Sequence, residues 1–298
     1  MNYTLSIVLF IICISQADAQ RFSTASSKEE TISYINSRLQ NSLKEEYDKI
    51  SFTGNEIILI LKGGKRREEH KIMDWTDFEE INFSKWNLML KFKKENSVIS
   101  KGYLNVTGEN TFTDYVDYIF INGSIFKEKD ENLEAAFIHL SRITIESKFP
   151  GKPSFDETVK YINGYLSQIK HVEGDGRYGN IQNMYSYQNI KAKLTQSKYN
   201  INDFDLHVSY RYSNENLGIH VSLSDIVRIS PMYRQGEGVS SATYFIQFYE
   251  KGNEKETDNY LPLFYGKASI ESIENSQIYK AFNHLRKLCG APEPLKFD

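Results

Sequence analysis

Pairs of histidines are the residues of this chain that could most directly do chemistry. His207 and His220 fall on the polar faces of two segments that alternate polar and apolar residues, 205–212 and 219–223. Pairing these segments as a hairpin places His220 near Ser209, so the imidazoles become diagonal neighbours about 7–8 Å apart at their backbones. A structural zinc site usually needs four ligands, and the pattern adds none to these two. We therefore interpret both as solvated histidines and expect no metal and no cofactor.

A second pair, His139 and His284, occupies the same position in two similar segments near residues 140 and 285. A catalytic histidine needs a nucleophile or carboxylate partner, and the sequence places none beside either one. We expect each to bond a backbone carbonyl of the adjacent sheet. No catalytic residue is assigned, and the sequence favours a protein that is not an enzyme.

A glycine motif at Gly174, Gly176 and Gly179 has the Gly-x-Gly-x-x-Gly spacing of dinucleotide-binding loops. That chemistry requires a strand before the motif and a helix N-terminus after it, so that free N–H groups meet the pyrophosphate. Here the motif follows a predicted helix, so we interpret it as a loop.

A basic hairpin tip is formed by Lys65, Arg66 and Arg67. Such a cluster could bind an anionic glycan, a lipid headgroup or phosphate. Glu68 and Glu69 follow at once and largely cancel its charge, so a solvated turn is the simpler interpretation.

Tyrosines mark a further candidate binding segment, residues 171–200, which also contains several Asn and Gln residues. Tyr178, Tyr185 and Tyr187 are of a type common at recognition surfaces. A long loop of this kind can carry a binding function, and it could equally be a disordered spacer.

The elements that position these residues occur twice along the chain. Residues 27–36 resemble residues 154–163, and both begin with the Ser-x-x-Glu pattern of a helix capping box followed by apolar residues at helical spacing. Residues 133–140 resemble residues 278–285 with one apolar helix face each. A third match joins residues 76–81 to residues 224–229. Three matches in the same order indicate two diverged copies of one module.

Between the two helices of each copy the pattern changes to period two and predicts four to six antiparallel strands. The predicted strands are 57–61, 72–75, 86–92 and 115–121 in the first copy, and 205–212, 219–223, 244–248 and 260–265 in the second. The fold class is therefore α+β, with each module a helix, an antiparallel sheet or open barrel, and a closing helix. We favour a pleckstrin-homology-like roll, and the alternative is a cystatin-like helix on a sheet.

The predicted domain boundaries follow from these repeats. Residues 1–19 have the short apolar core and the Ala-Asp-Ala ending of a cleaved signal peptide, and no later apolar run could span a membrane. Residues 20–150 form the first module. Residues 151–298 form the second, with an insertion near residues 171–200.

Two segments of the second copy carry a resemblance to a known kind of module. They are the opening helix at residues 158–163 and the end of the copy, Ala281-Phe282-Asn283-His284-Leu285-Arg286-Lys287-Leu288-Cys289-Gly290. Together they resemble an uncharacterised α+β module of secreted bacterial proteins. The resemblance covers the two helices of each copy and little of the strands. It implies no known activity, and the signal-peptide pattern predicts export to the periplasm or the medium.

Composition narrows the function further. The chain has 298 residues and a formal net charge of -3, which gives no electrostatic reason to expect nucleic acid as a partner. We expect an exported, monomeric, non-enzymatic binding or scaffold protein whose partner is a protein or a glycan. The alternative is a hydrolase or a lipid- or small-molecule-handling protein with a cavity between sheet and closing helix.

Overall fold

The computed structural model describes most residues beyond position 21. The described ranges are 22–84, 87–104, 106–108, 110–123, 130–173, 176–178, 181–183, 186–212, 215–235, 241–252 and 259–291. The expected signal peptide, residues 1–19, lies outside them. Within these ranges no helix is long and apolar enough to cross a lipid bilayer.

The chain divides into two compact units. The first consists of Met1–Met73 and Ile81–Ile143, and the second of Asp74–Glu80 and Thr144–Asp298. The division falls between Ile143 and Thr144, whereas the predicted boundary lies after residue 150. What the sequence did not indicate is that the short segment Asp74–Glu80 belongs with the second unit.

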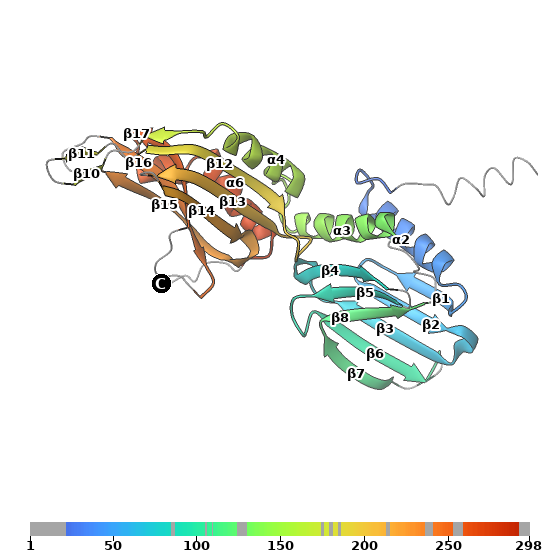
Figure 1. The fold of residues 1–298 in the computed structure, drawn as a ribbon. Helices are drawn as coiled ribbons and strands as arrows, with labels where there is room; N and C mark the ends of the chain where they lie inside the picture. Colours follow the sequence, from blue (N-terminus) through green and yellow to red (C-terminus); the bar gives the residue numbers. More distant parts are fainter. Residues whose placement is uncertain are drawn as a thin grey trace, which may run out of the picture. The chain divides into compact units, whose positions relative to one another are not determined.

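The first unit combines two antiparallel sheets with helices on one side (Figure 1). The opening helix is α2 (Lys28–Ser42), whose N-cap Ser27 forms the predicted capping box with Glu30, and the closing helix is α3 (Glu131–Glu146). The larger sheet has the order β1-β2-β3-β6-β7, with β1 (Tyr47–Phe52), β2 (Glu56–Leu61), β3 (Arg66–Ile72), β6 (Val98–Leu104) and β7 (Asn110–Val116). The smaller sheet has the order β4-β5-β8, with β4 (Phe78–Phe83), β5 (Asn87–Phe92) and β8 (Tyr118–Asn122).

The apolar stripes predicted for the two helices of the first unit are buried in its core. Fully buried side chains from these helices include Ile35, Leu39, Leu133, Phe137 and Leu140. Phe137 also packs against Phe52 of β1, with the ring centroids 5.7 Å apart. Each such side chain contributes about 1.5–3 kcal/mol by leaving water, so the stripes hold the helices on the sheets.

The second unit repeats this plan of helix, antiparallel sheets and helix (Figure 1). Its helices are α4 (Phe155–Leu166), α5 (Ile270–Glu274) and α6 (Gln277–Leu288). One sheet has the order β14-β13-β12-β9, with β9 (Val172–Glu173), β12 (Ser186–Gln196), β13 (Phe204–Tyr212) and β14 (Glu215–Ser222). The other has the order β15-β16-β17, with β15 (Ile226–Gln235), β16 (Ala242–Glu250) and β17 (Tyr260–Gly266). A small hairpin joins β10 (Gly176–Tyr178) to β11 (Ile181–Asn183).

Helix α6 closes the second unit over a packed core. Its buried side chains include Ile278, Phe282, Leu285 and Leu288, and the Phe282 ring meets Phe248 edge to face at 5.4 Å. Arg286 is buried as well, and its Nη1 donates hydrogen bonds to the carbonyls of Ile226 and Val227. The predicted α+β class is confirmed for the described residues of both units.

The predicted insertion at residues 171–200 contains a principal strand of the second unit, which corrects the interpretation of this whole segment as a loop. Strand β12 pairs with β13 from Gln188 to Gln196. Its pairing shifts between Gln188 and Lys191, and Asn189 there has a φ of 53°. This bulge interrupts the alternation of apolar residues, which is why the sequence did not reveal a strand.

One pair of asparagines makes the same contacts in both units. Asn36 of α2 donates to the carbonyl of Phe52 at 2.7 Å and accepts from its N–H at 2.8 Å. Asn163 of α4 does the same with Leu194 of β12, at 3.2 and 2.8 Å. In each unit the opening helix is thereby tied to the backbone of a strand.

The two closing-helix histidines also make matching contacts. Nε2 of His139 lies 2.8 Å from the carbonyl oxygen of Ser26, and Nε2 of His284 lies 2.7 Å from that of Pro153. These carbonyls directly precede the N-caps of α2 and α4 rather than belonging to a sheet. The predicted carbonyl bond is thus present, but it joins the closing helix to the start of the opening helix.

Candidate functional site

The outer face of β13 carries polar side chains that are well placed to bind a ligand. Leu206 and Val208 are buried, so the alternate residues Asp205, His207 and Ser209 lie on the opposite face. Because successive residues of a strand point to opposite faces, burial of one set fixes the exposure of the other.

His207 and His220 lie directly opposite each other on β13 and β14. Their imidazole rings stack with centroids 4.5 Å apart and planes 10° apart. The sequence had placed His220 near Ser209, as a diagonal neighbour, because it assumed a longer hairpin loop. The pairing instead continues to Tyr212 and Glu215, which leaves only residues 213–214 between the strands. The two histidines are therefore direct cross-strand neighbours.

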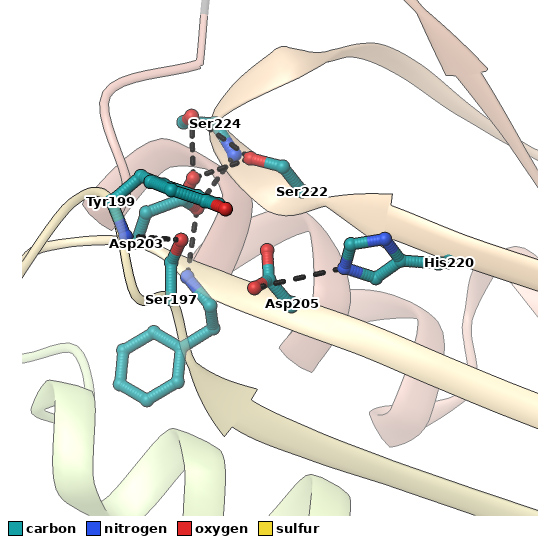
Figure 2. A network of polar contacts seen from close by, with 8 residues as sticks. Ser197, Tyr199, Asp203, Asp205, His220, Ser222 and Ser224 are labelled. Carbon is teal, nitrogen blue, oxygen red and sulfur yellow. Dashed lines mark hydrogen bonds and ion pairs between the residues drawn. The ribbon is translucent and has the colours of Figure 1, made fainter.

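Asp205 joins the two histidines. Its Oδ2 lies 3.7 Å from Nε2 of His220 (Figure 2). One ligand atom from each of Asp205, His207 and His220 lies within 4.8 Å of the other two. Sequence reasoning missed Asp205, although a residue two positions before His207 on a strand must share its face.

A buried carboxylate anchors the end of the hairpin that carries these residues. Asp203 is 3% exposed, and its Oδ2 accepts hydrogen bonds from the hydroxyls of Ser222 and Ser224 (Figure 2). Its Oδ1 accepts from the backbone N–H groups of Phe204 and Ser224, at 2.7 and 2.9 Å. Four donors satisfy a carboxylate that would otherwise be costly to bury. The network stabilises the end of the hairpin at which Asp205 of β13 pairs with Ser222 of β14.

A groove of about 650 Å³ lies beside His207. Exposed lysines Lys170, Lys191 and Lys193 line it, and Val208 and Ile219 contribute apolar surface. Among the described residues, no acidic side chain pairs with these three lysines. The groove therefore offers positive charge beside an apolar surface.

The predicted basic tip belongs to the first unit, whereas the groove belongs to the second. Lys65 is exposed at the turn. Arg66 forms an ion pair with Glu68 at 3.0 Å, and Arg67 forms one with Glu69. The arginines are thus engaged by the two glutamates that follow them, as the sequence indicated.

Tyr187 is the tyrosine candidate whose side chain the structure describes. Tyr187 is 2% exposed and stacks on Tyr212 with centroids 4.8 Å apart, which corrects its assignment to a recognition loop. Burial raises the pKa of its hydroxyl well above the ordinary value. Tyr185 and the side chain of Tyr178 lie outside the described residues, as do Gly174 and Gly179 of the glycine motif, whereas Gly176 begins strand β10.

A buried polar cluster in the first unit was also missed from the sequence. Nδ1 of His70 lies 2.8 Å from Oγ of Ser100, and its Nε2 lies 3.7 Å from Oε2 of Glu68. A Ser-His-carboxylate set can serve acyl transfer when the hydroxyl is accessible. Ser100 and His70 are only 7% and 8% exposed, so a substrate cannot reach the Ser100 oxygen without opening the sheet. We interpret the cluster as structural.

Comparisons with known proteins identify no relative that could assign this site. The chain matches no protein-family model, and neither the curated proteins nor the solved structures include a significant match to it.

Proposed function

We propose that the protein is an exported, monomeric, non-enzymatic binding protein built from two copies of one module. The paired asparagine and histidine contacts support the duplication, because they recur at matching positions of both units. Two antiparallel sheets closed by a helix in each unit support the pleckstrin-homology-like roll over the cystatin-like alternative. The asparagines and histidines that both copies share serve the packing of each unit. We therefore assign binding to polar residues that occur in one copy alone.

The groove beside His207 is the observation that carries the binding function. Lys170, Lys191 and Lys193 bring three positive charges to one groove, and Ser167 and Ser209 add hydroxyl groups. Charges of one sign in a groove attract and orient ligands of opposite charge. The groove fits an anionic partner, and we propose an acidic glycan, whose hydroxyl groups and ring faces match the polar and apolar lining.

The packed cores behind the closing helices favour this function over lipid or small-molecule handling. Leu133, Phe137 and Leu140 in the first unit, and Phe282 and Leu285 in the second, are fully buried. These side chains fill the space between sheet and closing helix that a ligand cavity would have to occupy.

The test is a binding titration of the mature protein with a sulfated oligosaccharide and its desulfated counterpart. Replacing Lys191 and Lys193 together by Ala is expected to weaken binding of the sulfated form by about tenfold, since each exposed charge pair contributes up to about 1 kcal/mol. The matched control replaces the exposed lysines Lys49 and Lys198, which removes the same charge away from the groove. Equal effects of the two double variants, or equal binding of the desulfated form, would show that the groove is not the binding site.

A further inference from the structure

We infer that Asp205, His207 and His220 form a binding site for one divalent transition-metal ion of the Zn²⁺ and Cu²⁺ class. The inference goes beyond glycan binding and does not depend on it, because the metal ligands and the groove lysines are different side chains. Only His207 contributes to both.

The donor atoms are the kind that such ions take. Imidazole nitrogen suits Zn²⁺, Cu²⁺ and Ni²⁺, and a carboxylate oxygen completes many of their sites. Two imidazoles and one carboxylate make a poor site for Ca²⁺ or Mg²⁺, which prefer oxygen ligands throughout. Three protein ligands leave at least one coordination position open to water or to another ligand.

The distances require little movement. Ligands held about 2.0–2.2 Å from a tetrahedral ion lie roughly 3.3–3.5 Å apart. Oδ2 of Asp205 is 3.7 Å from Nε2 of His220, and all three donor atoms lie within 4.8 Å of one another. The rings stack nearly in parallel, so rotation about their side-chain bonds must turn both nitrogens toward the ion. Such a rotation is open to them, because His207 and His220 are exposed.

The backbone under these ligands is held in place before any ion arrives. His207 and His220 are a direct cross-strand pair, and the Asp203 network fixes the end of the hairpin next to Asp205. The Asp205 side chain is 13% exposed, so it has less freedom to lose on binding than a solvated carboxylate.

Three of the four other histidines of the described chain are engaged elsewhere. His139 and His284 bond backbone carbonyls, and His70 lies buried against Ser100. Among the described residues, no other group of three His, Cys, Asp or Glu side chains brings its donor atoms together in this way.

Lys193 faces the site from the neighbouring strand. It is paired with His207 across β12 and β13, and its ammonium group repels a bound cation. The same charge attracts the anionic ligand of the groove. Replacing Lys193 by Gln is therefore expected to strengthen metal binding about two- to threefold and to weaken glycan binding, so the two proposals respond in opposite directions to one change.

The experiment is isothermal titration of the tag-free mature protein with ZnCl₂ and, separately, CuCl₂ in metal-free buffer. We expect one ion per chain. His207→Ala, His220→Ala and Asp205→Asn should each lower the affinity at least about tenfold, because loss of even an outer-shell partner commonly costs that much. His171→Ala is the matched control, since His171 is exposed in the same unit and lies outside the site.

Thermal unfolding of each variant without metal shows whether its fold is intact. Zn²⁺ should raise the melting temperature of the wild type, His171→Ala and Lys193→Gln, and should raise it less for the three ligand variants. Failure of the wild type to bind either ion at millimolar concentration would overturn the inference. Binding that survives loss of both His207 and His220 would overturn it as well. Neither result bears on the lysine groove, which the glycan titration tests by itself.

Discussion

Replacing Asn36 or Asn163 by Ala tests whether the two units share one set of helix-to-strand contacts. Each change removes a side-chain amide that donates to the carbonyl and accepts from the N–H of one strand residue, which is Phe52 in the first unit and Leu194 in the second. Each lost hydrogen bond costs about 1 kcal/mol net, and more where the backbone group stays buried. We therefore expect each variant to lose about 2 kcal/mol of unfolding free energy.

Differential scanning calorimetry of the full mature chain measures this loss. For units of this size, about 2 kcal/mol corresponds to a fall of roughly 5–8 °C in the melting temperature of the affected unit. Asn41→Ala is the matched control, because Asn41 is exposed on the same helix as Asn36, and it should shift the transition by less than about 2 °C. Shifts at Asn36 and Asn163 no larger than the control, or a large shift at only one of them, would refute the equivalence of the two contacts.

Three further outcomes are expected. The exported chain should begin at Gln20, and an intact mass that retains the leader would contradict cleavage there. Glu68→Gln should destabilise the protein at neutral pH, and this loss should shrink as the pH falls below the ordinary glutamate pKa and through the lowered pKa of Glu68. The reason is that His70 and the Arg66 guanidinium hold the pKa of the Glu68 carboxyl below its ordinary value, so this stabilisation is lost as the pH falls. Urea titrations at pH 7 and pH 3.5 measure the difference in unfolding free energy between Glu68→Gln and the wild type. The same difference at both pH values would contradict this reasoning. Cys289 is fully buried, so a thiol reagent should label it only after denaturation, and rapid labelling of the native protein would place it at the surface.

The helices could be predicted because their signals are local. Capping boxes at Ser27 and Ser154 and the apolar stripes lie within a few turns of chain, and the structure places both opening helices within a few residues of the prediction. Strands with clean alternation, such as β13, were also found. Strand β12 was missed because the bulge at Asn189 breaks its alternation, although Ala192 and Leu194 continue it beyond the bulge.

The candidate sites depended on contacts that the sequence does not encode locally. The position of His220 depends on the length of one hairpin loop, and an error of two residues moved it from His207 to Ser209. The contact between His70 and Ser100 arises because β6 pairs with β3 and not with its neighbour in sequence, β5. No spacing rule predicts that choice of partner.

The central claim tested here is that Asp205, His207 and His220, on the outer face of β13 and β14 in the second unit, form a metal-binding site. Crystals of the mature protein grown with Zn²⁺, measured on both sides of the zinc absorption edge, test it most directly. We predict one strong anomalous peak about 2.0–2.2 Å from Oδ of Asp205 and from a ring nitrogen of both His207 and His220. A peak held by other residues, or no peak at this hairpin in zinc-saturated crystals, would contradict the account.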